Sequence, residues 1–243
     1  MSRILVLGGR SDIGRAIACK FAKSGFDILL AGKNPLELSD DASDLQIRHG
    51  INARTIRLDV LDFDSHDRFI EDAGADLAGV VCVVGYLGNQ ILGENDFKEA
   101  RRIIDTNFTG CVSVLNRIAK LFELQKSGLI IGVSSVAGDR GRQSNYLYGS
   151  AKAGFSAYLS GLRNRLAKSN VSVITVKPGF VNTKMTLGLN LPPLLTAQPE
   201  EVASDILKAV RRKKDIVYTK WFWKYIMIII GAIPEKLFKR MKL

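Results

Sequence analysis

The chain is poor in the residues that build disulfide frameworks and metal centres. Among its 243 residues are three cysteines and two histidines. Cys19, Cys82 and Cys111 lie far apart, which fits neither a disulfide framework nor a zinc-ligand pattern and indicates a reducing cytoplasm. His49 and His66 stand among polar residues without the spacing of a metal pair, so we expect both to be exposed to solvent. The sequence therefore predicts no metal site and no secreted fold.

Long hydrophobic runs are also lacking. At the N-terminus, glycines stop the apolar run of MSRILVLGG after four residues, which is too short for a secretory signal. The uninterrupted apolar run of the last segment, residues 225–233, has nine residues, whereas a spanning helix needs about twenty. We therefore expect neither export nor a membrane-spanning helix.

Acidic residues are scarce at one end of the chain only. The formal net charge is +11, but residues 208–243 hold eleven Lys or Arg against two acids. The rest of the chain holds twenty-four basic and twenty-two acidic residues. A nucleic-acid partner is not expected, because its electrostatic footprint would lie on the folded body and not in a terminal segment that also contains an apolar run.

The body of the sequence alternates short apolar runs with longer amphipathic stretches. The runs are RILVL (3–7), FDILLA (26–31), ARTIRL (53–58), AGVVCVV (78–84), GLIIGVSS (128–135), VSVITV (171–176) and DIVYT (215–219). This rhythm predicts an α/β fold of the Rossmann type, a doubly wound parallel sheet of about seven strands with helices on both faces. We expect one domain over residues 1–219 and a separate extension over residues 220–243. Ligands should bind where the strands end.

A glycine-rich turn follows the first run, in VLGGRSDIGRAIA (6–18). Gly8 and Gly9 allow a tight turn, and Gly14 allows close packing of the helix that follows, whose N-terminal amides can bind a pyrophosphate. A P-loop is excluded, because no Gly-Lys-Ser/Thr follows. A nucleotide site and a purely structural turn both fit this segment when it is taken alone.

Together with five later motifs, the turn resembles the short-chain dehydrogenase/reductase family over about residues 3–210. The motifs are RLDV (57–60), DTNFTG (105–110), VSSVAG (133–138), YLYGSAK (146–152) and PGFVNT (178–183). Two features depart from the family pattern: Leu7 and Asp12 replace a threonine and a glycine of the turn, and CVVG (82–85) replaces NNAG. The GGxSxIG form of the turn is similar to that of a branch that includes decaprenylphosphoryl ketopentose reductases.

The resemblance implies a catalytic set of Asn107, Ser135, Tyr148 and Lys152. Tyr148 and Lys152 are four residues apart and share one face of a helix, so the cation can favour a phenolate whose pKa is otherwise near 10. In the reducing direction Tyr148 protonates the carbonyl oxygen, Ser135 holds that oxygen, and Asn107 holds a relay water. Tyr146 has only a serine at the same spacing, and we expect it to serve packing or to form a pocket wall.

The resemblance also implies a nicotinamide cofactor. Its predicted contacts are Gly8, Arg10, Ser11, Ile13, Gly14, Lys33, Asp59, Val60, Gly85, Tyr148, Lys152, Pro178, Gly179, Val181 and Thr183. An acid at the end of the second strand would bind the ribose hydroxyls of NAD, whereas a base would accept the 2′-phosphate of NADP. The sequence has Lys33 and Asn34 there, which favours NADP(H) over NAD(H).

The last segment, YTKWFWKYIMIIIGAIPEKLFKRMKL (218–243), differs from the rest. Trp221, Phe222, Trp223 and Tyr225 precede its apolar stretch, and lysines and an arginine follow it. This order is typical of an anchor at the interface of an anionic membrane, here the cytoplasmic face. A buried segment that covers a dimer interface or the substrate pocket is the alternative.

These features favour an NADPH-dependent reductase of a carbonyl on a hydrophobic, lipid-linked substrate such as a keto-sugar. A soluble reductase or dehydrogenase of a small hydrophobic ketone or alcohol fits the same motifs. A non-catalytic nucleotide-sensing protein is a third interpretation, although such proteins typically lose the tyrosine or the lysine. The family resemblance implies assembly as a dimer or tetramer.

Overall fold

The computed structural model describes residues 2–241 and is built on a parallel sheet of seven strands. These strands are β1 (Arg3–Leu7), β2 (Asp27–Gly32), β3 (Ala53–Arg57), β4 (Leu77–Cys82), β5 (Gly128–Val133), β6 (Val171–Pro178) and β9 (Ile216–Thr219). They lie in the order β3-β2-β1-β4-β5-β6-β9, and every neighbouring pair is parallel. Each apolar run of the sequence forms one of these strands, so the predicted fold class is confirmed.

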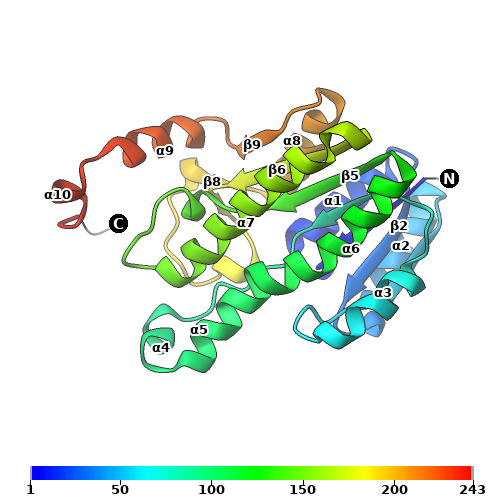
Figure 1. Ribbon diagram of the computed structural model, residues 1–243, viewed down its shortest axis with the longest axis horizontal. Coiled ribbons are helices and arrows are strands. Elements are labelled where there is room, and N and C mark those ends of the chain that lie inside the picture. Colours follow the sequence, from blue (N-terminus) through cyan, green and yellow to red (C-terminus); the bar gives the residue numbers. More distant parts are fainter. Residues whose placement is uncertain (1, 242–243) are drawn as a thin grey trace.

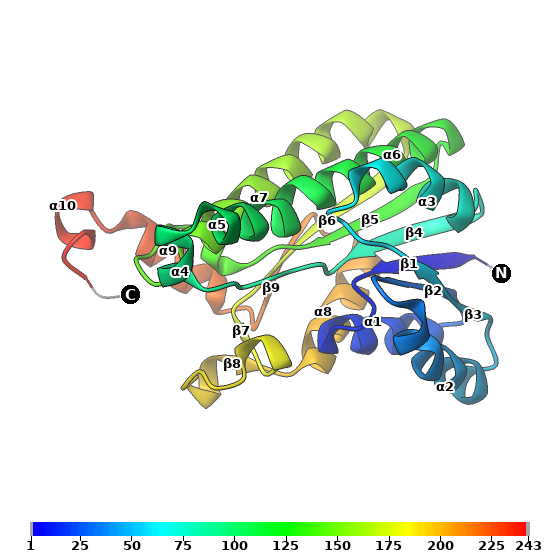
Figure 2. The same ribbon diagram turned by 90° about the horizontal axis from the view of Figure 1, so that it is seen from below.

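Helices cover both faces of the sheet. They are α1 (Asp12–Ala22), α2 (Ser39–His49), α3 (His66–Ala73), α4 (Gln90–Asn95), α5 (Phe97–Ile104), α6 (Gly110–Gln125), α7 (Tyr146–Leu166), α8 (Pro199–Arg211), α9 (Trp223–Ala232) and α10 (Glu235–Phe238). In Figure 2, α1, α2 and α8 lie below the sheet, and α3, α6 and α7 lie above it. No helix within residues 2–241 is long and apolar enough to cross a membrane.

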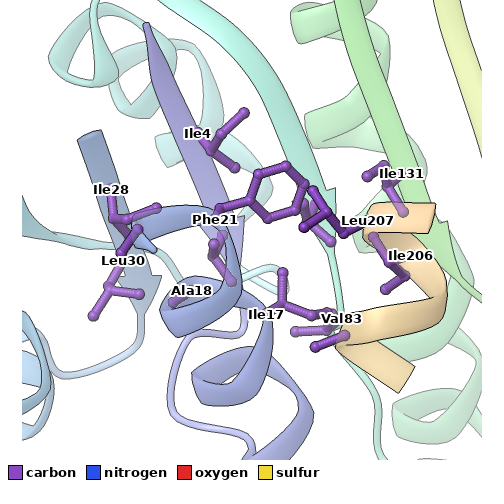
Figure 3. Packing of buried hydrophobic residues seen from close by; sticks show 14 of the residues in the cluster. Ile4, Ile17, Ala18, Phe21, Ile28, Leu30, Val83, Ile131, Ile206 and Leu207 are labelled. Atoms are coloured by element: carbon purple, nitrogen blue, oxygen red, sulfur yellow. The ribbon is translucent and has the colours of Figure 1, made fainter. Parts of the chain in front are cut away.

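The two hydrophobic cores follow from the alternation of side chains along the strands. In β1, Ile4 and Val6 belong to the core under α1 and α8, whereas Leu5 and Leu7 belong to the core under α6 and α7. Because both faces are covered, the strand is a continuous apolar run. Figure 3 shows Phe21 packed between the sheet and α8. Burying such a side chain contributes roughly 1.5–3 kcal/mol, which holds α1 against the sheet.

The strand order reverses between β1 and β4, and this places the ends of both strands beside one crevice. β1 continues into the glycine turn and α1, and β4 continues into residues 83–89. A Cβ on Gly8 would lie 3.2 Å from the backbone nitrogen of Val84, and Gly8 has a φ of +88°. Only glycine meets both demands without strain, so the turn brings the two strand ends into contact.

One expectation about the histidines is wrong. His66 is fully buried, and its Nδ1 lies 2.9 Å from the hydroxyl of Ser113 while its Nε2 lies 3.3 Å from the carbonyl oxygen of Asp59. The polar neighbours in sequence point outward from α3, whereas His66 shares the inward face with Phe69 and Ala73 at spacings of three and seven residues. His49, at the end of α2, is half-buried.

Candidate active site

A cavity of about 650 Å³ lies at the carboxyl ends of the central strands. Its lining comes from the segments that follow β4, β5 and β6 and from the first turn of α7. It includes the following residues that the sequence singled out: Ile13, Gly85, Ser135, Tyr148, Lys152, Pro178, Gly179, Val181 and Thr183. Residues from five separate motifs therefore meet in one place, at the crevice where the strand order reverses.

Lys152 is the most enclosed charge of this cavity, with 2% of its surface exposed. Its Nζ donates to the carbonyl oxygens of Val84 at 3.3 Å and Val133 at 3.2 Å, so it bridges the ends of β4 and β5. The same Nζ lies 5.8 Å from the centre of the Tyr148 ring. Among the described residues, no carboxylate forms an ion pair with Lys152.

Ser135 begins the short turn Val136–Gly138 that follows β5. Its Oγ accepts a hydrogen bond from the amide of Ala137 at 3.1 Å. The turn lies directly on α7, because a Cβ on Gly138 would come within 2.7 Å of the Ala153 nitrogen, and one on Gly149 within 2.8 Å of the Ala137 oxygen. These two glycines allow Ser135 and Tyr148 to face the same cavity.

Ser134, the neighbour in sequence, has a different environment. It is buried, and its Oγ donates to the carbonyl oxygen of Lys152 at 2.9 Å and lies 2.7 Å from the hydroxyl of Ser156. These contacts tie β5 to α7.

Asn107 lies in a π-helical turn, Asp105–Thr109, between α5 and α6. Its Nδ2 donates to the carbonyl oxygens of Tyr86 at 2.6 Å and Ile103 at 2.8 Å, and its Oδ1 accepts from the amide of Tyr86. The side chain braces the segment after β4, where the family's paired asparagines are missing. Because the side-chain amide already has these partners, the relay water that we predict here would bind to the backbone of the turn. Single π-helical turns are frequent at functional sites.

The start of α1 is organised by Ser11 and Asp12. The Ser11 Oγ accepts from the amide of Gly14 at 3.0 Å, caps the helix, and donates to the carbonyl oxygen of Gly8 at 2.9 Å. Asp12, which replaces a family glycine, accepts from the amide of Lys184 at 2.8 Å. Its carboxylate therefore joins α1 to the segment after β7 (Phe180–Val181).

The remaining predicted cofactor contacts lie outside the cavity lining, near the ends of β2 and β3. Lys33 Nζ lies 2.9 Å from the Asp59 carboxylate, and Arg10 pairs with Glu37. Partial burial opposes ionisation of Asp59, but hydrogen bonds from Lys33 and the Leu61 amide lower its pKa overall. Val60 is buried in the core against the first residue of α6, so only its backbone is available to a ligand.

Tyr146 does not form a wall of the cavity. It is 40% exposed, and slight desolvation together with the nearby carboxylate of Glu94 raises its pKa. Tyr146 and Tyr148 point to opposite faces of α7, because successive helical positions are about 100° apart and residues two apart therefore differ by about 200°. The expectation that Tyr146 lines the pocket is therefore wrong.

The C-terminal segment packs next to the site on one side. Trp223 and Met227 of α9 are both 4% exposed and pack against Val136 and Phe180. The indole Nε1 donates to the carbonyl oxygen of Leu195 at 3.2 Å, and a Cβ on Gly179 would lie 1.9 Å from that nitrogen. The prediction that the aromatics of this segment face a membrane is therefore wrong for Trp223.

Arg140 fixes the end of α9. Its guanidinium donates to the carbonyl oxygens of Ile230, Gly231 and Ile233, pairs with Glu235 at 2.7 Å, and lies 4.0 Å from the centre of the Phe238 ring. The segment between Ser135 and Tyr148 thereby holds the tail. Lys242, counted among the basic residues of the tail, lies outside the described residues.

Sequence reasoning missed Arg142 and Asn145, which line the cavity, and the inward face of α9. No motif or apolar period marks residues 139–145. For α9, the apolar content was visible, but nothing in the sequence separates Trp223 from Trp221.

Comparison with known proteins gives consistent matches. A family model described as short chain dehydrogenase matches residues 2–192. An uncharacterized oxidoreductase of Mycobacterium tuberculosis is 32% identical over 241 residues, which cover 98% of this chain and 96% of the relative. A 3-oxoacyl-(acyl-carrier-protein) reductase of Synechocystis is 31% identical over 212 residues, with 83% and 86% covered. The fold is similar to that of a short-chain dehydrogenase from Sphingobium yanoikuyae in complex with NADPH, with a TM-score of 0.83, 19% identity, and 100% and 97% of the two chains covered.

Proposed function

The chain belongs to the short-chain dehydrogenase family of oxidoreductases, and from this premise we propose that it reduces a carbonyl group to an alcohol with NADP(H). One observation carries the proposal: Ser135, Tyr148 and Lys152 line a single cavity of about 650 Å³. A phenol, a hydroxyl and an enclosed cation in one cavity are the groups needed to donate a proton to a carbonyl oxygen and to hold that oxygen in place.

The residues at the site fit a nicotinamide cofactor, which supplies the hydride when bound. A Cβ on Gly85 would lie 3.4 Å from the Oδ1 of Asn107 and 3.7 Å from the Nζ of Lys152, so glycine leaves room there for a ligand close to the backbone. The N-terminus of α1 offers amides to a diphosphate. Tyr148 would then give its proton to the carbonyl oxygen while Ser135 donates a hydrogen bond to it, and Lys152 favours the phenolate that remains.

NADP(H) is proposed over NAD(H) because Lys33, and not an acid, stands directly after β2. Lys33 and Arg10 would bind the 2′-phosphate, but they already form ion pairs with Asp59 and Glu37. Both cations are largely exposed, with 65% and 68% of their side chains accessible, and exposed ion pairs are worth only about 0–1 kcal/mol. A 2′-phosphate, with more than one negative charge, can therefore compete for both cations.

We propose a hydrophobic substrate, such as a lipid-linked keto-sugar. Apolar side chains from separate segments line the cavity, among them Leu87, Ile91, Met185 and Leu189. We propose a keto-sugar because the form of the glycine turn is similar to that of the ketopentose reductases. A soluble reductase of a small hydrophobic ketone is the alternative, favoured by the packing of Trp223 beside the cavity.

We also propose that residues 1–219 form the catalytic domain and that the extension binds an anionic membrane through its outer face. Trp221, Tyr225, Ile228 and Ile229 are between 56% and 72% exposed, at successive spacings of four, three and one residues. Lys224 lies among them, and Lys236, Lys239 and Arg240 follow, all exposed. An apolar stripe beside cations complements acyl chains beneath anionic headgroups.

Substitution of the two tyrosines of α7 tests the catalytic assignment. Tyr148→Phe should lower turnover of a ketone with NADPH by at least about a hundredfold, because it removes the proton donor, while NADPH affinity stays within about twofold. Tyr146→Phe is the matched control and should change turnover by less than about threefold, since its ring lies outside the cavity. NADPH oxidation followed by absorbance measures both. Equal losses in the two variants, or a larger loss in Tyr146→Phe, would refute the assignment.

A further inference from the structure

The lining of the cavity holds two charged side chains, and both are cations. Lys152 lies beside Tyr148, and Arg142 comes from the segment that joins the Ser135 turn to α7. No carboxylate lines the cavity among residues 2–241. The cavity is therefore positively charged at a second place, away from the enclosed lysine.

Arg142 lacks the anionic partner that Arg140, in the same segment, has. Its Nη2 donates to the Sδ of Met227 at 3.2 Å, a weak acceptor, and it forms no ion pair with a described residue. Asp139, whose charge acts on Arg142, is engaged by Lys177 at 2.5 Å and by the hydroxyl of Tyr218 at 2.9 Å. Burial lowers the pKa of Arg142, and the charge of Asp139 offsets this only in part.

Arg140, two residues earlier in the same segment, has the set of partners expected of a structural arginine. It has a carboxylate, three carbonyl oxygens and an aromatic ring as partners. Arg142 has instead the thioether of Met227 as its hydrogen-bond acceptor. Because a partly buried cation without an anionic partner is costly, this difference indicates that its partner is supplied by a ligand.

Asn145 gives a second, independent indication. Its Oδ1 is buried and has no hydrogen-bond partner among the described residues, and Asn145 lines the same cavity. Buried acceptors in folded proteins are nearly always paired, so this oxygen is suited to a donor that a ligand brings.

Arg142 and Asn145 lie on the substrate side of the site. They precede Tyr148 by six and three residues, on the segment that follows Ser135. The diphosphate of a dinucleotide is expected at the opposite side, at the glycine turn and the first turn of α1. The two polar groups are therefore placed to contact the molecule whose carbonyl meets Ser135 and Tyr148.

We propose that Arg142 and Asn145 form a subsite for an anionic group of the substrate. The ketone carries a phosphate or carboxylate that binds Arg142, and a hydroxyl or amide close to it donates to the Oδ1 of Asn145. This inference rests on the proposed function, because it concerns the substrate of the same site. It narrows the substrate class to hydrophobic ketones that bear one negative charge or more.

Paired ketones that differ in charge test the subsite. The probes are 4-acetylbenzoate and 4-acetylphenyl phosphate as anions, and methyl 4-acetylbenzoate as the neutral analogue. The wild-type protein should show a kcat/KM at least about tenfold higher for an anion than for the ester, since hydrogen bonds between charged groups are worth roughly tenfold to a hundredfold. Comparison of the two anions shows whether phosphate or carboxylate is preferred.

Variants assign this preference to Arg142. Arg142→Gln should reduce the ratio of anion to ester to about one, and Arg142→Lys should keep part of it, because the charge remains. Arg211→Gln removes the same charge from the exposed end of α8 and should leave the ratio unchanged. Thermal unfolding of each variant separates loss of the subsite from loss of the fold. An unchanged ratio in a folded Arg142→Gln protein would overturn the proposal.

Binding without turnover separates this proposal from the proposed function. With NADP⁺ bound, the ketones cannot be reduced, and titration calorimetry measures their affinity. If the anions bind through Arg142 but no variant or wild-type protein reduces any ketone with NADPH, the subsite stands and the reductase assignment fails. If ketones are reduced but the anions bind no more tightly than the ester, the reductase assignment stands and the subsite is wrong.

Discussion

Lys33 is the residue on which the choice of cofactor depends most directly. Its ammonium lies at the end of β2, where the adenosine ribose is expected, and its present partner is the partly buried carboxylate of Asp59. Lys33→Asp should shift the ratio of dissociation constants toward NAD(H) by about tenfold or more, because a carboxylate repels the 2′-phosphate and accepts from the ribose hydroxyls. Lys168→Asp, on an exposed site after α7, is the control. Fluorescence titrations with NADPH and NADH measure the ratio, and a wild-type protein that prefers NADH would contradict the prediction.

His66 connects stability to pH. Burial lowers its pKa from the ordinary 6.5, with smaller opposing contributions that include the hydrogen bond to Asp59. The unfolded chain then takes up a proton at a higher pH than the folded protein does, so the free energy of unfolding is largest above pH 6.5 and falls as the pH drops below it. One proton limits the slope to about 1.4 kcal/mol for each pH unit.

His66→Gln should flatten this slope, because the variant has no group that titrates at this position. Urea denaturation at several pH values around 6.5 measures it in both proteins. Equal slopes in the wild type and the variant would show that the buried imidazole does not contribute.

The helix α9 has a buried face and an exposed face. Its inward face, with Trp223 and Met227, covers Gly179 and Phe180, and the indole also binds the carbonyl oxygen of Leu195. The segments that carry these residues border the cavity. Removal of the whole tail would therefore expose apolar surface beside the site.

A matched pair of tryptophans tests the inward face. Trp223→Ala should lower the free energy of unfolding by about 3–5 kcal/mol and raise the KM for a ketone, because it leaves a cavity next to Gly179 and frees Leu195. Trp221→Ala removes the same side chain from a position that is 72% exposed, and should change stability by less than about 0.5 kcal/mol. Denaturant unfolding and steady-state kinetics measure both effects. A stable, fully active Trp223→Ala protein would show that α9 does not position these segments.

At the scale of the whole molecule, exposed apolar side chains lie on α9 and on the segment that follows β7, and others lie on α2 and α6. The central strands end and α9 extends on the side of the molecule opposite the N-terminus (Figure 1), and the segment between β7 and β8 (Thr196–Ala197) projects below the sheet in Figure 2. Leu187 and Leu194 of that segment are 85% and 81% exposed. A molecule that meets a bilayer with this end would present the mouth of its cavity to lipid-borne substrates.

Vesicle sedimentation tests this orientation. The protein should sediment with vesicles that contain phosphatidylglycerol and much less with pure phosphatidylcholine. Rising salt should weaken only the electrostatic part of the binding, and not the part due to apolar insertion. Replacing both Ile228 and Ile229 by Ser should weaken binding by at least about tenfold without a change in thermal stability, because both side chains are exposed in the free protein. If the full chain stays in the supernatant under all conditions, the tail is a structural cover, and the soluble-reductase alternative replaces the membrane proposal.

The sequence alone determined the sheet, because strands buried on both faces must be continuous apolar runs, and these are visible without a structure. It also determined the pairing of Tyr148 with Lys152, since a spacing of four residues on a helix is a local property. The glycine turn is local as well.

Only the tertiary structure decided which side chains of a polar or mixed segment face inward. His66, Trp223, Arg142 and Asn145 are ordinary in sequence, and their burial or lack of partners depends on residues between 28 and 85 positions away or on the shape of the whole cavity. Such contacts arise when distant segments pack together, and no local pattern records them. The tail is a further example. Its apolar composition is visible in the sequence, but α9 acquires a buried face and an exposed face only when it packs against Gly179.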